Sequence, residues 1–131
     1  MLHIPYRGTA PALIDTLGGQ TQVYFAALSA AIEHIRAGKL RALAVTTAAR
    51  VSALPDVPII GEFLPGYESS AFTGIGAPRN TSSQVVNTLN REINAGLADP
   101  KINARFADLG STVIPGSPSD FGKLIADETE K

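Results

Sequence analysis

The chain contains no cysteine and only two histidines among its 131 residues. Without a thiol it can form neither a disulfide nor a thiolate metal ligand, although this absence does not separate cytoplasm from periplasm. Neither His3 nor His34 has a carboxylate at the spacing of a known zinc motif. We therefore expect no metal site.

The chain also lacks an excess of charge of either sign. Its formal net charge is −1 and its basic residues are spread along the sequence, so we expect no nucleic-acid partner. Hydrophobic residues make up 44%, which indicates a globular chain of about one domain. No apolar run approaches the length of a membrane span. Residues 1–5 do not form a signal peptide, which predicts a cytoplasmic location if the chain is a complete natural product.

Motifs of catalysis are missing as well. The sequence has no G-x-S-x-G elbow and no phosphate-binding G-x-x-x-x-G-K motif, and Gly74-x-Gly76 lacks the third glycine of a dinucleotide fingerprint. The acidic residues Asp56, Glu62 and Glu68 do not form a recognisable acid–base pair. The chain is therefore predicted not to be an enzyme, with no catalytic residue and no cofactor.

Helical and strand patterns alternate in the first third of the chain. Apolar residues at helical spacing and glycine stops predict helices over 10–17 and from Ser29 to Gly38, whereas alternation and short apolar runs predict strands at 20–25 and 40–46. Residues 3–5 read as the end of a further strand. This order predicts an α/β fold of right-handed βαβ units with a parallel sheet.

A segment rich in helix breakers follows, because five prolines and glycines fall within residues 48–68. We expect an extended segment that crosses between two lobes, with one helical turn near residues 59–63. The predicted parts are thus residues 1–47, the crossing segment 48–69, and residues 70–131.

The last part begins with a predicted strand over 70–77, where Gly74 and Gly76 either permit close approach of a ligand or backbone or mark a bulge. Capping patterns then predict three helices, which begin at Thr81 with Gln84, at Asp99-Pro100 and at Ser117 with Asp120. A short strand is expected over 111–114.

The stretch from His3 to Ala12 carries the candidate site. It reads as a strand end, a tight loop and the first turn of a helix, with Thr9 as a potential cap and Pro11 in the first turn. Free backbone N–H groups at such a helix start, beside Arg7, attract a carboxylate or phosphate. The alternative is an ordinary strand-to-helix connection with nothing bound.

Several stretches together resemble the Bug (TctC-type) periplasmic solute receptors of tripartite tricarboxylate transport systems. The matching stretches cover nearly the whole chain in the order of the family, and they are His3–Ala12 (family H-V-P-Y-K-G-x-x-P-A), Leu17–Val23 (L-G-G-Q-V-Q-V), Ile35–Thr46 (I-K-A-G-K-L-R-A-L-A-V-T), Leu54–Pro58 and Pro65–Glu68.

The resemblance implies part of a type II periplasmic-binding-protein fold, a two-lobe clamp that binds small carboxylates between its lobes without metal or cofactor. Residues 1–47 would then be the last part of the second, ligand-binding lobe, and 70–131 the returning part of the first lobe. It also implies a periplasmic location and membrane transporter subunits as partners. The residues placed at the ligand by resemblance are Tyr6, Arg7, Gly8, Thr9, Ala10, Ala26 and Ala27.

Two departures from the family pattern bear on function. The family usually has Asp, often Asp-Asn, where this chain has Ala26-Ala27, and alanine cannot hold a ligand's amine or fix a water. The N-terminal half of the family fold is also missing from this sequence. Uncovered strand edges and apolar faces then predict a homodimer or higher oligomer. The function is thus predicted to be that of a truncated solute receptor, or alternatively that of an oligomeric fragment with a structural or interaction role and no ligand.

Overall fold

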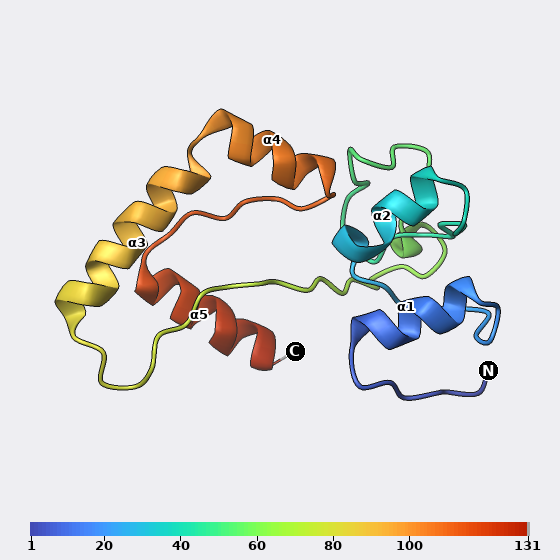
Figure 1. Ribbon diagram of the computed structural model, residues 1–131, viewed down its shortest axis with the longest axis horizontal. Coiled ribbons are helices and arrows are strands. Elements are labelled where there is room, and N and C mark those ends of the chain that lie inside the picture. The colour runs from blue at the N-terminus through green and yellow to red at the C-terminus, as the bar shows by residue number, and fades with distance from the viewer. Residues whose placement is uncertain (131) are drawn as a thin grey trace. The chain divides into compact units, whose positions relative to one another are not determined.

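The computed structural model describes residues 1–130. The chain divides into two compact units (Figure 1). Unit 1 comprises residues 1–71 and 109–111, and unit 2 comprises residues 72–108 and the chain from residue 112 onward. The chain passes from unit 1 to unit 2 after Ala71, and residues 109–111 belong to unit 1 again.

Unit 1 contains the helices α1 (Thr9–Leu17) and α2 (Leu28–Arg36) and the short 3-10 helix η1 (Ile60–Glu62). The helical turn expected near residues 59–63 is confirmed as η1. Both α-helices begin one residue earlier than predicted, so that Thr9 lies in the first turn of α1 and Ser29 in the first turn of α2. Neither residue caps its helix, so the prediction of Thr9 as a cap was wrong.

Three side chains form the buried core of the described chain, namely Ala12 of α1 and Ala31 and Ile32 of α2, and all three belong to unit 1. The residues after α2 are fixed by an exposed ion pair, in which Arg50 Nη2 lies 2.8 Å from Glu62 Oε1. This pair joins the start of the breaker-rich segment, at Arg50, to η1, which lies near the middle of that segment. Residues 48–71 consequently pack within unit 1, and η1 occupies part of them.

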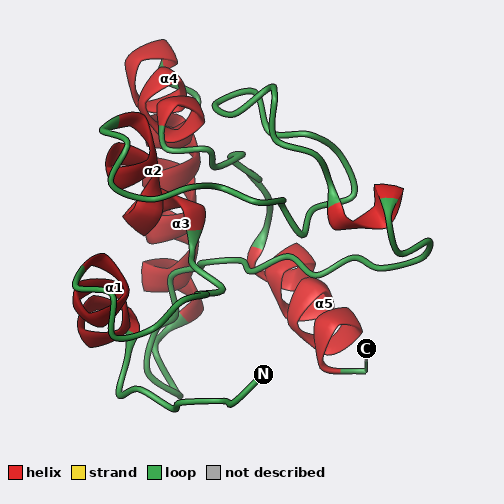
Figure 2. Cartoon of the chain, turned by 90° about the vertical axis from the view of Figure 1, so that its right-hand side faces the viewer, coloured by secondary structure: helices red, strands yellow, loops and turns green. Residues whose placement is uncertain are grey.

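The segments predicted as strands are extended but form no ladder among residues 1–130, and Figure 2 accordingly shows loops where they run. A single isolated parallel bridge joins Val45 and Ile59, through hydrogen bonds of 2.9 Å from Val45 N to Pro58 O and from Ile60 N to Val45 O. A strand needs a neighbour that supplies the other half of each hydrogen bond. The alternation in the sequence therefore predicts extended backbone, but the parallel sheet itself is not formed by the described residues.

Unit 2 contains α3 (Ser83–Leu97), α4 (Pro100–Asp108) and α5 (Pro118–Thr129). The cap of α3 is Ser82, whose hydroxyl accepts a hydrogen bond from Val85 N. The predicted capping box from Thr81 to Gln84 was wrong, because Thr81 instead donates its hydroxyl to Pro78 O at 2.8 Å. The cap of α4 is confirmed, since Asp99 Oδ1 accepts from Lys101 N at 2.8 Å.

The capping box of α5 is also confirmed. Ser117 Oγ accepts from Asp120 N at 3.2 Å, and Asp120 Oδ2 accepts from Ser117 N at 2.8 Å. Asp120 Oδ2 also accepts from the Ser117 hydroxyl at 2.7 Å. The hydroxyl bond and then the bond from Ser117 N favour the charged carboxylate, so the pKa of Asp120 lies below its ordinary value.

Two asparagines of α3 fix the segment that leads into α5. Asn90 Nδ2 and Asn94 Nδ2 donate to Gly116 O at 2.8 and 2.9 Å, and Gly116 N donates to Asn94 Oδ1 at 3.3 Å. The Asn94 side chain thus bonds both backbone groups of Gly116, much as a neighbouring strand would. On α4, the apolar side chains of Ile102 and Phe106 remain 42% and 39% exposed.

An aromatic contact joins α5 to the extended segment at the start of unit 2. The rings of Phe72 and Phe121 meet edge to face with centroids 6.1 Å apart and planes at 84°. The Phe121 ring also lies so close to Gly74 that a Cβ atom there would overlap it, whereas a Cβ at Gly76 would meet nothing within 4 Å. Close approach is therefore the explanation for Gly74, and the approaching group is an aromatic ring.

We expect Gly74→Ala to destabilise the protein and Gly76→Ala, its matched control, not to do so. The added methyl at residue 74 would push the Phe121 ring away, and such overpacking costs about 1–3 kcal/mol. The same methyl at residue 76 enters open space and should change the free energy of unfolding by less than about 1 kcal/mol. Urea unfolding of the two variants measures the difference, and equal stabilities would contradict the contact.

Candidate functional site

The loop at the start of α1 presents backbone donors. Gly8 is the N-cap of α1 at φ 119° and ψ 177°, a conformation that L side chains rarely adopt, and no side chain caps the helix. The amides of Thr9 and Ala10 precede the first helical hydrogen bond, and Pro11 has no N–H. Thr9 and Ala10 are both exposed, and their N–H groups lie at the positive end of the helix dipole.

The start of α2 has the same character. Its N-cap is Ala27, which offers no side-chain acceptor to the first turn. In unit 2, by contrast, Ser82, Asp99 and Ser117 supply side-chain acceptors at the starts of α3, α4 and α5. The two α-helices of unit 1 thus leave their first amides available, and the predicted site residues lie at these two helix starts.

Tyr6 is tied to α1 by its hydroxyl. The Tyr6 OH donates to Asp15 Oδ2 at 2.7 Å, across nine residues of sequence. This hydrogen bond is the main reason that the pKa of Tyr6 is raised above its ordinary value, and desolvation adds to it. Because Tyr6 immediately precedes Arg7 and Gly8, the bond holds the loop against the helix that it caps.

A second link joins the far end of α1 to the next extended segment. Thr16 Oγ1 donates to Ala12 O at 2.7 Å and lies 2.7 Å from Thr21 Oγ1. Backbone bonds from Gln20 N and Thr21 N to Asp15 O support the same turn. Asp15 therefore serves both segments that flank α1, through its side chain at Tyr6 and its carbonyl at the turn.

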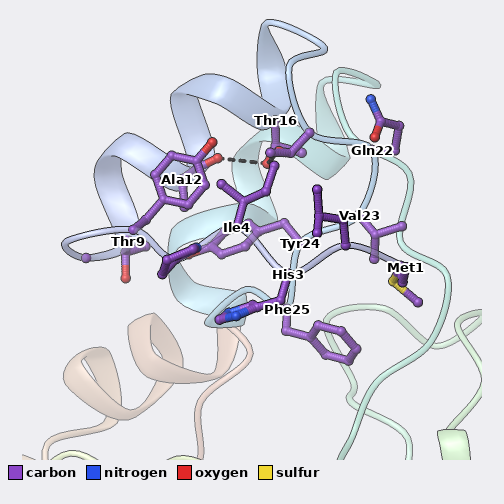
Figure 3. Close-up of a pocket in the computed structure, with 15 residues that line it drawn as sticks. Met1, His3, Ile4, Thr9, Ala12, Thr16, Gln22, Val23, Tyr24 and Phe25 are labelled. Atoms are coloured by element: carbon purple, nitrogen blue, oxygen red, sulfur yellow. Dashed lines mark hydrogen bonds between the residues drawn. The ribbon is translucent and has the colours of Figure 1, made fainter.

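A pocket of about 960 Å³ lies beside α1 in unit 1 (Figure 3). Of the predicted site residues, the structure brings Tyr6, Gly8 and Thr9 to its lining, but not Arg7, Ala10, Ala26 or Ala27. These four are exposed elsewhere on unit 1. The other lining residues come from the two extended segments and the inner face of α1: Met1, Leu2, His3, Ile4, Pro5, Ala12, Thr16, Thr21, Gln22, Val23, Tyr24 and Phe25.

Other kinds of site have no basis in the described residues. Among residues 1–130, no three His, Asp or Glu side chains gather as a metal site would need. No helix in that range combines the length and apolar composition needed to cross a bilayer.

Sequence comparison relates the chain to a family of receptors. The family model described as tripartite tricarboxylate transporter family receptor matches residues 1–131. The chain is 37% identical to a UPF0065 protein from the tcbD-tcbE intergenic region of Pseudomonas sp. strain P51, over all of this chain and 40% of that protein. It is 36% identical to protein BugT of Bordetella pertussis, over 98% of this chain and 40% of BugT. The chain thus spans about two fifths of these relatives.

Solved structures give the same result. A structure of a periplasmic transporter has 34% identity and a TM-score of 0.94, over 99% of this chain and 44% of that chain. MatC of Rhodopseudomonas palustris, solved with bound malate, has 30% identity and a TM-score of 0.84, over 95% of this chain and 44% of MatC. The periplasmic binding protein BugD has 38% identity and a TM-score of 0.75, over 88% of this chain and 39% of BugD.

We expect Tyr6→Phe to loosen the loop before α1, because it removes the hydroxyl that bonds Asp15. Backbone amides of residues 13–15, which are hydrogen-bonded in the part of α1 that the loop is tied to, should exchange with deuterium several-fold faster, while those of α5 stay unchanged. Tyr24→Phe, in the other extended segment, is the matched control. In the wild type, a spectrophotometric titration should show one phenol that ionises above the ordinary pKa, and Tyr6→Phe should remove it. Unchanged exchange at residues 13–15 would contradict the proposed role of the bond.

Proposed function

Since the chain belongs to the tripartite tricarboxylate transporter family of receptors, we propose that it forms the part of a solute receptor that binds a small carboxylate. The observation that carries this proposal is the pair of uncapped helix starts at Gly8 and Ala27. At each helix start, backbone N–H groups can donate hydrogen bonds to a carboxylate oxygen, and the helix dipole favours its negative charge. Exposed Arg7, beside Gly8, adds a positive charge to the first of them.

The chemistry of these residues favours an acid without an amine. Residues 26 and 27 are alanines, so no carboxylate there can bind an ammonium group or repel an anion. MatC, to which the chain is similar, holds malate. We therefore assign the chain a dicarboxylate of the size of malate, and rank malate and glutarate above aspartate.

Membership of the receptor family also supports a fold, a cellular compartment and a partner for the chain. The matched structures are periplasmic binding and transport proteins, so the chain is assigned to part of a type II periplasmic-binding-protein fold. A receptor of this family would act in the periplasm and deliver its solute to membrane subunits of the transporter. The family is one of receptors and not a class of enzymes, which supports a binding function for this chain.

A donor-deletion pair tests the carboxylate site. Thr9→Pro removes one backbone N–H from the first turn of α1, where proline is readily accommodated, and Thr9→Ala keeps that N–H while removing the same hydroxyl. A hydrogen bond to a charged group contributes about 1.5–3 kcal/mol, so Thr9→Pro should weaken malate binding at least tenfold and Thr9→Ala much less.

Thermal unfolding in the presence of citrate, malate, glutarate, aspartate and nicotinate measures the binding. A bound acid at 100 times its Kd adds about 2.7 kcal/mol of stability. Malate or glutarate should raise Tm and aspartate should do so less. If no acid raised Tm, the proposal would be overturned. If Thr9→Pro and Thr9→Ala lost the same amount of malate affinity, the N–H groups at the start of α1 would not be part of the binding site.

A second proposal concerns self-association, and the exposed surface carries it. The described chain exposes 9995 Å², whereas even two separate compact bodies with the masses of the two units would expose only about 7,900 Å². Large apolar side chains account for much of the excess, and those of Phe25, Phe63, Ile75 and Ile114 are each more than 70% exposed. The excess of about 2,000 Å² per chain is more than the roughly 800 Å² that each partner buries in an interface of standard size.

We therefore expect the isolated 131-residue chain to form a homodimer or a higher oligomer, which is also the basis of the alternative role as an interaction module without ligand. Light scattering coupled to size exclusion should give at least twice the 13.7 kDa chain mass at micromolar concentration. Tm should rise with protein concentration, since association stabilises the folded form. A monomer across the whole concentration range would contradict this prediction.

A further inference from the structure

Gly110 lies against Leu28, the first residue of α2. The backbone of Gly110 has a φ of +73°, and a Cβ atom there would overlap the Leu28 side chain, with Leu28 Cγ only 2.9 Å away. The same Cβ atom would also touch Val51 Cγ1 at 3.5 Å. In a packed region of this kind, the hydrogen atom of a glycine is the one substituent that leaves the Leu28 side chain in its place.

The contact joins segments of unit 1 that are far apart in the sequence. Residues 109–111 belong to unit 1, although α4, which precedes them, and the chain from residue 112 onward belong to unit 2. Every residue of α4 is exposed, whereas residues 109–111 are half-buried. This short segment is thus the part of the returning chain that unit 1 holds, and Gly110 is its central residue.

The segment around Val51 is itself fixed. Val51 O accepts a hydrogen bond from Leu54 N at 2.9 Å. The side chain of the preceding residue, Arg50, donates to the two carboxylate oxygens of Glu62 at 2.8 and 3.1 Å and to Pro55 O at 3.3 Å. A methyl group at residue 110 would therefore displace the Leu28 side chain, whose atoms are also the closer ones.

The backbone of Leu28 belongs to the helix start that we assign to the solute. Ala27, the N-cap of α2, offers no side-chain acceptor, and its carbonyl accepts from Ala30 N at 3.0 Å. The N–H groups of Leu28 and Ser29 come before the helical hydrogen bonds and have no backbone partner among the described residues. Leu28 thus carries both the side chain that Gly110 contacts and one of the donors proposed for the solute.

We propose that Gly110 is a positioning residue of the solute site, because it fixes the Leu28 side chain and thereby aligns the N–H groups of Leu28 and Ser29. This inference rests on the proposed function, since it names a residue that orients donors of that same site. Gly110 acts through Leu28 and offers no side chain to the solute. Donors keep a productive direction only when the residues behind them are held by packing.

The positive φ of Gly110 gives this glycine a second use, which a control has to separate from the contact. Gly110 is the second residue after α4, where a left-handed residue commonly ends a helix. Gly38 is the second residue after α2 and has a φ of +68°, but a Cβ atom on Gly38 would meet nothing within 4 Å. The two glycines therefore share the backbone requirement and differ in the contact, so Gly38→Ala is the matched control.

The test compares the two alanine variants of the full 131-residue chain, with malate as the probe. Gly110→Ala should weaken malate binding about tenfold, as expected when a hydrogen bond to a charged group is lost, and Gly38→Ala should change it by less than about twofold. Titration calorimetry measures both affinities. In the chain without malate, the NMR shifts of the Leu28 and Ser29 amides should move in Gly110→Ala and stay in place in Gly38→Ala.

Leu28→Ala provides a second variant, which keeps the test decisive even if Gly110→Ala does not fold. It preserves the N–H group of residue 28 but removes the atoms that Gly110 contacts, so it should also weaken malate binding. The double variant should bind malate no more weakly than Leu28→Ala alone, because losses at two residues in contact do not add. Malate affinity of the wild type in Leu28→Ala would refute the proposal.

The outcomes separate this inference from the proposed function. If the wild type bound no acid, the proposed function would fail, and the role of Gly110 in that site would fail with it. If the wild type bound malate and a folded Gly110→Ala bound it equally well, this inference alone would be wrong. It would be equally wrong if Gly38→Ala weakened binding as much as Gly110→Ala, because the backbone conformation and not the contact would then be responsible.

Discussion

Extended backbone carries a row of N–H and C=O groups that only another strand, a side chain or water can satisfy, and this constraint determines much of the present structure. Helices complete their hydrogen bonds within one stretch of sequence, so α1 to α5 form wherever their local signals allow. Strands do not, and here Val45 and Ile59 are joined by one isolated bridge. Where a partner is at hand, the structure uses it, as when the amide of Asn94 bonds both backbone groups of Gly116.

The same difference decides what could be predicted from sequence. The box of Ser117 with Asp120 and the cap at Asp99 were predictable because all the atoms involved lie within four residues. Thr81 was wrongly chosen over Ser82 because two adjacent hydroxyl residues compete for one cap. Only the turn at residues 79–80, which brings the Thr81 hydroxyl to Pro78 O, decides between them. The sheet could not be derived, because alternation indicates which residues become extended and not which segment lies beside them.

The candidate site was predictable to a similar depth. The pattern of Gly8 and Pro11 indicated a helix start with free amides, and the structure has that start with Gly8 as the cap. The bond from Tyr6 to Asp15 was not predictable, because a nine-residue separation carries no signal until the loop is folded against the helix. Apolar pocket residues such as Ile4 and Val23 had been assigned to strands, and alternation alone does not tell a packed face from one that awaits a partner.

The division of capped and uncapped helices matches the proposed location of the solute site in unit 1. A side-chain acceptor at a helix start forms hydrogen bonds with the first amides, so these amides are not available to a ligand. Ser82, Asp99 and Ser117 occupy the first amides of α3, α4 and α5 in this way. An uncapped start leaves the same donors unsatisfied by protein, which is tolerable only where water or a solute reaches them. The uncapped starts of α1 and α2 lie in unit 1, the unit that also holds the buried core of Ala12, Ala31 and Ile32. The donors proposed for a solute therefore lie in the unit that holds the buried core, and packed support preserves the direction of such donors when no solute is bound.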